Sequence, residues 1–317
     1  MKRFLLLLAL VPAMAHSQGY PNRAVRMIVP FAPGGASDLV GRILQPRMSE
    51  LLGQQVVVEN RGGAAGNIGV EAGARSAPDG YTFVLGNIGS IAINPAVFPN
   101  LSVTPTRDLI AVTQVVDVPS ALVAHPSFAP NNIKELIDYA RANPGKLNYA
   151  STGNGTSNHL SFELFKTMTH TNVTHIPYKG SAPAVTDLIA GQVQVMFDNT
   201  PNVLPHVRAG KLKAIAVSTK KRSPYAPEVP TVDEAGVPGY DVSVWFGVLT
   251  VAGTPREIVN RLNTEMVRIL TSAEVKERFS KLGVDVVAGS PEQFASFLKG
   301  EVDRWAKVIR EAGIKAD

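Results

Sequence analysis

Three residues of this 317-residue sequence have the types that form a nucleophilic triad: Ser157, His159 and Asp198. A hydrolase that presents its serine between a strand and a helix uses a Gly-x-Ser-x-Gly turn, and the sequence contains none. Ser157 and His159 also lie only two positions apart near an expected helix start, where side chains diverge. A serine hydrolase is therefore a distant alternative, and His159 is expected to pack or hydrogen-bond locally.

Metal ligands are equally scarce. The six histidines are scattered, and no His-Glu-x-x-His motif occurs. His159 and Glu163 have the i, i+4 spacing of two ligands on one helix face, but the pair has no third ligand nearby in the sequence. The sequence predicts neither a metal nor another cofactor.

A glycine-rich turn follows the first apolar run, in the stretch IVPFAPGGASD. An expected strand, Val25 to Phe31, stops at Pro33-Gly34-Gly35, and a helical pattern begins at Ser37-Asp38. Such a turn exposes backbone N–H groups and the positive end of a helix dipole, which together favour an anion. The stretch matches neither a dinucleotide-binding nor a phosphate-loop signature. A tight turn capped by Ser37 or Asp38 explains it equally well.

A second loop of the same kind spans Tyr149 to His159 and reads YASTGNGTSNH. It too follows an apolar run and precedes a helical pattern. Two such loops facing each other predict opposed sets of amide donors, suited to a small molecule with one or more carboxylates. Charge-assisted hydrogen bonds contribute about 1.5 to 3 kcal/mol each, so three or four reach the roughly 8 kcal/mol of micromolar binding after ordering costs.

Other candidate residues have two interpretations each. Arg61, in a third glycine loop from Asn60 to Asn67, either reaches a carboxylate or is an ordinary structural arginine. Asp198 follows the expected strand Val193 to Phe197. It either contacts an amino or hydroxyl group of a ligand or caps the helix after Thr200-Pro201. Tyr178 and Trp245 are expected in the core first and at a cleft wall second.

Short β-branched runs alternate with helical patterns along the chain, which predicts an α/β architecture with a parallel sheet. Apolar stripes at helical spacing run from Ile133 to Ala140 and from Ile258 to Ile269. The remaining expected strands are Val56–Glu59, Tyr81–Leu85, Ala121–Ala124, Ala214–Ser218, Val242–Val251 and Val284–Val287.

Four helix starts carry capping signals, each with a polar residue at the N-cap and Glu or Gln three positions later. These pairs are Thr254 with Glu257, Ser290 with Gln293, Asn132 with Glu135, and Thr271 with Glu274. The first two also have proline at the first helical position.

The length predicts two domains. Two long strand-like runs, Ile110 to Val118 and Val242 to Val251, bracket the middle third. If both cross between halves, the second domain is an insertion and the crossings form a double hinge. The ligand site is then the cleft between the halves.

The first residues differ from the rest. Lys2 and Arg3 precede the apolar run Phe4 to Val11, and Ala13-Met14-Ala15 has the small-x-small pattern of a signal-peptidase site, which predicts export to the periplasm. Because it has no cysteine, the sequence offers neither a disulfide framework nor a lipoprotein-type acylation site. Without Lys2 and Arg3, the chain has 29 basic and 26 acidic residues, a net charge of +3, and no long basic run. Nucleic acid is therefore not an expected partner.

These blocks together resemble the tripartite tricarboxylate transporter substrate-binding proteins, also called Bug receptors. The resemblance extends over nearly the whole chain after the first residues, through IVPFAPGGASD, GQQVVVENRGGAAGNIG, RANPGKLNYASTGNGTSNHL and HIPYKGSAPAVTDLIAGQV. Gly62 stands where the family usually has proline, and Thr250-Val251-Ala252 stands where Ala-Pro usually precedes Ala-Gly-Thr-Pro.

The resemblance implies a type II periplasmic binding-protein fold, in which two α/β lobes close on a small carboxylate without catalysis. It assigns to ligand binding Phe31, Ala32, Pro33, Gly34, Gly35 and Asp38 in the first loop, Ser151, Gly153, Gly155, Thr156 and His159 in the second, and Asp198 in the cleft. It also implies that the ligand is presented to membrane permease subunits.

We therefore expect a signal peptide at residues 1–15, lobe 1 at 16–117 and 244–317, and lobe 2 at 118–243. The expected protein is a monomeric periplasmic receptor for an organic anion: a di- or tricarboxylate, an aromatic acid or an acidic amino acid. A ligand sensor that signals without transport is the nearer alternative.

Overall fold

The computed structural model describes residues 19–98 and 100–312, so the expected signal peptide lies outside the described residues. The elements in chain order are β1 (Val25–Val29), α1 (Ala36–Leu52), β2 (Val56–Asn60), η1 (Ala64–Gly66), α2 (Asn67–Ala74), β3 (Thr82–Asn87), η2 (Ile88–Ile93), α3 (Asn94–Val97), α4 (Pro105–Asp108), β4 (Leu109–Ala124), α5 (Ile133–Ala142), β5 (Asn148–Ser151), α6 (Ser157–Thr169), β6 (Thr174–Pro177), α7 (Ser181–Ile189), β7 (Val195–Asn199), α8 (Thr200–Arg208), β8 (Lys213–Val217), β9 (Ser243–Val251), α9 (Arg256–Thr271), α10 (Ala273–Lys281), β10 (Asp285–Val286) and α11 (Pro291–Ala312).

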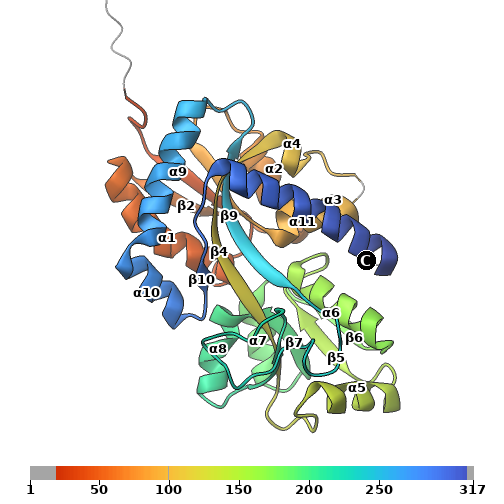
Figure 1. Cartoon of the computed structure of the whole chain (residues 1–317). Helices are drawn as coiled ribbons and strands as arrows, with labels where there is room; N and C mark the ends of the chain where they lie inside the picture. Colours follow the sequence, from red (N-terminus) through yellow and green to blue (C-terminus); the bar gives the residue numbers. More distant parts are fainter. Residues whose placement is uncertain (1–18, 99, 313–317) are drawn as a thin grey trace, which may run out of the picture.

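The chain folds into the two α/β lobes that were expected (Figure 1). Lobe 1, at the top of the view, contains β1 to β3 with α1 to α4 and the helices α9 to α11. Lobe 2, at the bottom, contains α5 to α8 and the strands β5 to β7. The long strands β4 and β9 run between the lobes.

The sheet is mixed rather than parallel. The strand order is β2-β1-β3-β9-β4-β7-β5-β6. Strands β1, β2 and β3 pair in parallel, as do β5, β6 and β7. In contrast, β4 is antiparallel to β7, β8, β9 and β10, and β9 is antiparallel to β3. The expectation of parallel strands therefore holds within each lobe and fails along the strands that join the lobes.

Strand β4 changes partners where it crosses between the lobes. Residues Leu109 to Pro119 pair with β9, whereas Ser120 to Ala124 pair with β7. The two runs expected as separate strands, Ile110 to Val118 and Ala121 to Ala124, are thus one strand of 16 residues. Pro119 has no N–H group and so cannot donate a hydrogen bond to a neighbouring strand. It stands where β4 leaves one partner strand for another. The lobe boundaries near 117 and 243 stay a prediction.

Two of the four expected caps are wrong. Helix α9 begins after Pro255 without a side-chain cap, because the Thr254 hydroxyl donates to the carbonyl of Val251 instead. At α10 the N-cap is Ser272, since Thr271 is still the last residue of α9.

At the other two helix starts, the N-cap side chain accepts from the N–H three positions later, as expected. Ser290 and Gln293 bond reciprocally through their side chains and backbone N–H groups. The side chain of Asn132 accepts from the N–H of Glu135, and Glu135 reaches the N–H of Asn131.

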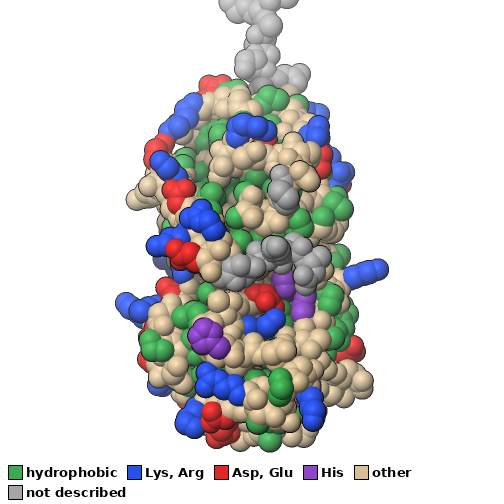
Figure 2. Space-filling view, turned by 90° about the vertical axis from the view of Figure 1, so that its right-hand side faces the viewer, with side chains coloured by type: hydrophobic (Ala, Val, Ile, Leu, Met, Phe, Trp, Pro, Cys, Tyr) green, Lys and Arg blue, Asp and Glu red, His purple; other side chains and the backbone are tan. Residues whose placement is uncertain are grey.

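The expected apolar stripes face the interior. Ile133, Leu136 and Ala140 of α5 are buried, as are Val259, Leu262, Met266 and Ile269 of α9. Trp245 is a core residue, with its indole N–H donating to Glu301. Basic and acidic side chains are interspersed over the face in Figure 2, so this face does not present a field of one sign. Within the described residues, no helix has the length and apolar character needed to cross a bilayer.

Candidate functional site: a cleft between the lobes

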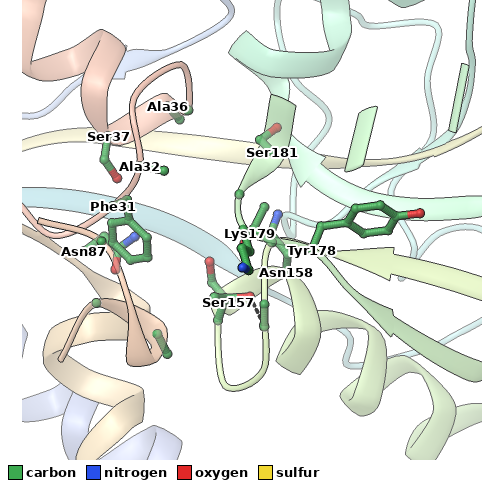
Figure 3. A pocket seen from close by; sticks show the side chains of 18 of the residues that line it. Phe31, Ala32, Ala36, Ser37, Asn87, Ser157, Asn158, Tyr178, Lys179 and Ser181 are labelled. Atoms are coloured by element: carbon green, nitrogen blue, oxygen red, sulfur yellow. Dashed lines mark hydrogen bonds between the residues drawn. The ribbon is translucent and has the colours of Figure 1, made fainter. Parts of the chain in front are cut away.

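A cavity of about 650 Å³ lies between the lobes. Lobe 1 contributes Phe31, Ala32, Pro33, Gly35, Ala36, Ser37, Asn60, Gly62 to Gly66 and Asn87. Lobe 2 contributes Thr152 to Asn154, Thr156 to Asn158, Tyr178 to Ser181, Asp198, Asn199 and Asn202. Figure 3 shows Phe31, Ser37 and Asn87 on one side of the space and Ser157, Asn158 and Ser181 on the other.

Helices α1, α6 and α7 are among those that begin at this cavity. Their N-cap residues are Gly35, Thr156 and Gly180, and none of these three caps makes a side-chain hydrogen bond to its helix. The first N–H groups of a helix have no partner within the helix. The three helix starts therefore direct backbone donors and positive dipole ends at one space, which favours an anion.

The first loop places only part of its predicted residues at the cavity. Phe31, Ala32, Pro33 and Gly35 line it. Gly34 has a φ of +85°, and its N–H donates to the carboxylate of Asp38 over 3.1 Å. Asp38 also pairs with Arg42, whose hydrogen bonds hold the pKa of Asp38 below its usual value although burial opposes this. Gly34 and Asp38 therefore shape the turn and are not among the lining residues.

The second loop is similar. Gly153 and Thr156 line the cavity, whereas Ser151, Gly155 and His159 do not. The N–H of Gly153 donates to the Ser151 hydroxyl, and the N–H of Gly155 donates to Nδ1 of His159. The N–H of Thr156 donates to the carbonyl of Gly153. The glycine amides that the sequence offered as donors are thus used inside the loop, and the available donors come from the helix starts.

The third loop lines the cavity through its backbone and methyl groups. Gly62 to Gly66 are lining residues, and both alanines between the glycines have positive φ, +46° for Ala64 and +55° for Ala65. Arg61 is not among the lining residues; its side chain pairs with Glu59 at 2.6 Å. The structural interpretation of Arg61 is therefore the one that the geometry supports.

Asp198 is one of the lining residues and is fully buried. Its carboxylate accepts hydrogen bonds from Asn158 of α6 and Asn202 of α8, both at 3.0 Å, and from Ser181 of α7. The N–H of Asn199 is a fourth donor. Burial raises the pKa of Asp198, and these hydrogen bonds act in the opposite direction. Asp198 thus hydrogen-bonds to residues in the first turns of three helices. The sequence suggested that it caps one helix, and the structure shows it bonded to three helix starts.

The lobes approach each other closely around the cavity. A methyl group built on Gly180 would lie 3.6 Å from Cβ of Ala32, and one built on Gly34 would lie 4.0 Å from Cβ of Ala182. Small residues at these points let the first loop of lobe 1 reach the start of α7 in lobe 2.

The arrangement does not form a triad. His159 accepts from Gly155 and stacks on His175, while Asp198 is bonded to amides and to the Ser181 hydroxyl. Among residues 19–98 and 100–312, no cluster of three or more His, Cys, Asp or Glu side chains has the geometry of a metal site.

Several lining residues were not individually assigned to ligand binding from the sequence, namely Asn60, Asn87, Asn158, Lys179, Ser181, Asn199 and Asn202. Asn87 and Asn199 end strands, and Asn158 and Ser181 lie in first helical turns. A systematic search of strand ends and helix starts would have found these four. Tyr178 was expected in the core first; it lines the cavity and its hydroxyl donates to Asp187 at 2.8 Å.

A two-lobed fold whose cleft is surrounded by helix starts and neutral donors defines a solute-binding protein. Residues 40–314 match the family described as the tripartite tricarboxylate transporter family receptor. Protein BugT of Bordetella pertussis is 40% identical over 306 residues, which cover 96% of this chain and 94% of BugT.

Two solved structures agree with this match. An R. palustris protein solved with adipate has a TM-score of 0.90 and 40% identity, covering 93% of this chain and 99% of its own. MatC from Rhodopseudomonas palustris with bound malate has a TM-score of 0.87 and 35% identity, covering 92% and 100%. The chain belongs to the tripartite tricarboxylate transporter receptor family, a family of solute-binding receptors rather than enzymes. Its fold is the two-lobed binding-protein fold that the resemblance implied.

Proposed function

We propose that this protein captures a small organic carboxylate in the cleft by closure of its two lobes. It works in the periplasm as a monomer, after removal of a signal peptide near Ala15, and delivers the ligand to permease subunits in the membrane. Lobe 1 comprises residues 16–117 and 244–317, lobe 2 comprises 118–243, and β4 and β9 bend near the change of partner at Pro119.

The observation that carries this proposal is the convergence of α1, α6 and α7 on one cavity without side-chain caps. A carboxylate at this point accepts N–H donors from both lobes and so holds them together. Three or four charge-assisted bonds of about 1.5 to 3 kcal/mol each are enough for micromolar affinity after ordering costs.

The charges of the lining residues support a ligand with one or more carboxylates. Among the lining residues that the structure describes, Asp198 is the one acidic residue, and its oxygens already face four donors. Lys179 is the one cation in this described set. Two structures of the same family were solved with adipate and with malate, which are both dicarboxylates.

A binding screen tests the proposal. The purified mature protein is heated with mono-, di- and tricarboxylates, aromatic acids and acidic amino acids, and hits are confirmed by calorimetry. A true ligand raises the melting temperature by mass action, by an amount that grows with its concentration. If no organic acid raises the melting temperature, carboxylate capture is the wrong function. Uptake assays with and without the permease genes then separate transport from sensing.

A further inference from the structure

Two histidines from different elements stack on each other next to residues Ser151 to Thr156. These residues are the central part of the second glycine loop and are called the cleft loop below. His159 belongs to α6 and His175 to β6. Their ring centroids are 4.1 Å apart and the rings are inclined by 16°. His159 is 1% exposed and His175 is half-buried. Neither lines the cavity, so the proposed function gives them no direct role.

Each histidine holds one part of the cleft loop. Nε2 of His175 lies 2.6 Å from the Ser151 hydroxyl, which in turn accepts from the N–H of Gly153 over 3.1 Å. Nδ1 of His159 accepts from the N–H of Gly155 over 3.1 Å. Both glycines have positive φ, +130° and +75°, a conformation that side-chain-bearing residues rarely adopt. The histidine pair therefore supports the two most unusual backbone positions of the loop.

The hydrogen bond to Gly155 specifies the protonation of His159. A backbone N–H is only a donor, so Nδ1 of His159 must carry no proton. An imidazolium has N–H groups at both nitrogens and would lose this bond. The face-to-face stack opposes a proton on either ring when the other is charged.

The surroundings of His175 favour its neutral form at ordinary pH. Burial lowers the pKa of His175 to about 4, and His159 contributes in the same direction. Tyr149 of β5 stacks on His175 at 4.8 Å. Glu163 lies 3.9 Å from Nε2 of His159, and it is bonded to Lys166 and to the Tyr149 hydroxyl. Burial opposes ionisation of Glu163, but those two hydrogen bonds hold its pKa below the usual value.

We propose that His159 and His175 are positioning residues, which hold the cleft loop in its binding conformation only while Nδ1 of His159 carries no proton. When a proton reaches this nitrogen, Gly155 loses its acceptor, the loop relaxes, and affinity for the carboxylate falls. This inference rests on the proposed function for its effect on ligand, but its effect on the loop is measurable without any ligand.

The first experiment uses the ligand-free wild-type protein. Nuclear magnetic resonance follows the ring nitrogens of both histidines and the amides of Gly153 and Gly155 from pH 8 to pH 4. The glycine amides shift together with the ring nitrogens, at a midpoint below the usual histidine value of about 6.5. A protonated Nδ1 on His159 at pH 7, or glycine amides that stay still while the rings titrate, contradicts the proposal.

The second experiment measures adipate and malate binding by calorimetry at pH 7.5 and pH 4.5. The double variant His159→Asn with His175→Gln keeps a polar group near each bonding nitrogen but cannot take up a proton. Its affinity falls less between the two pH values than that of the wild type, and the difference widens as the pH approaches 4, where His175 takes up a proton. The comparison removes the contribution of ligand protonation, which is the same for both proteins.

Apolar variants and a matched control complete the test. His159→Leu and His175→Phe each lose at least tenfold in affinity at pH 7.5, and the polar replacements restore most of it. His125→Gln is the control, because His125 also bonds a serine, Ser127 at 2.7 Å, but it lies outside the cleft loop, directly after β4, and is not among the lining residues. Equal pH dependence in wild type and double variant overturns the proposal. A wild type that binds no organic acid contradicts the proposed function instead, while the resonance titration still tests the loop.

Discussion

The side-chain amide of Asn158 donates to the carboxylate of Asp198 over 3.0 Å, which joins the first turn of α6 to the end of β7. The same amide nitrogen lies 2.9 Å from the carbonyl of Phe197. Because Ser181 and Asn202 also donate to Asp198, one buried carboxylate orients the starts of three helices. The cleft of lobe 2 therefore depends on a residue that a ligand need not touch.

Replacing Asp198 by asparagine should damage both stability and binding. The new amide keeps the size of the carboxylate but presents N–H groups to donors that have lost their acceptor. A buried donor without a partner costs about 1 to 3 kcal/mol. We expect a loss of about 2 to 4 kcal/mol in the free energy of unfolding by urea and at least a tenfold loss of ligand affinity. Asp138→Asn, on the exposed surface of α5, is the control. Unchanged affinity in Asp198→Asn would show that the helix starts keep their positions without it.

Gly35 allows a test of whether the ligand lies close to the backbone at the start of α1, because a larger side chain at this position causes no backbone strain. Its φ is −96°, and a methyl group built on it meets no atom within 4 Å. Gly35→Val should therefore fold normally but fill part of the cavity beside the start of α1, with about a tenfold loss of affinity, or roughly 1.4 kcal/mol. Gly300→Val, at another open position on α11, is the matched control. Calorimetry that gives the same affinity for both variants and the wild type contradicts the placement of the ligand at α1.

Lys179 should distinguish ligands by charge. It is the one cation among the described lining residues, and it is exposed. A second carboxylate within its reach gains an attraction that a monocarboxylate lacks, and exposed pairs contribute about 0.2 to 1 kcal/mol. Lys179→Met should weaken adipate binding by about two- to fivefold and reduce its salt dependence, while a monocarboxylate of equal length is unaffected. Lys211→Met is the control on the surface. An equal loss for both ligands argues for a steric effect.

Asp117 should make the stability depend on pH. Burial and then the charge of Glu301 raise its pKa to about 6, and Asp285 acts in the same direction. Because the ionised form is disfavoured in the folded state, the stabilising contribution is complete below about pH 4 and is lost as the pH rises to about 6. Asp117→Asn should therefore exceed the wild type in unfolding free energy by about 1 to 3 kcal/mol at pH 7.5.

Urea unfolding at pH 4 and pH 7.5 checks this prediction. The two proteins should be nearly equal at pH 4, where Asp117 is protonated in the wild type. The asparagine keeps a side chain that can bond to Gln114, which now donates to Asp117 at 3.1 Å. A variant that is less stable than the wild type at both pH values shows that the carboxylate is needed for packing between β4, β9 and α11.

The sequence alone determined the local units of this protein. Strand ends, glycine turns and apolar stripes follow from short-range rules, so the alternation of strands and helices was predictable, as were the stripes of α5 and α9. The quoted motifs also led to the family. The caps expected at Thr254 and Thr271 are wrong for two local reasons. The Thr254 hydroxyl donates to the carbonyl of Val251, and α9 extends through Thr271.

The tertiary structure decided which donors face the cleft. Gly34, Gly153 and Gly155 looked like amide donors in the sequence, but their N–H groups bond to Asp38, Ser151 and His159. No sequence pattern shows this, because the folded loop decides which acceptor lies close to each N–H group. An N–H group that already donates within the loop is not available to a ligand. For the same reason the antiparallel course of β4 and the stacking of His159 on His175 appear only in three dimensions. Local propensity specifies the elements, whereas the pairing of residues distant in the chain specifies the site.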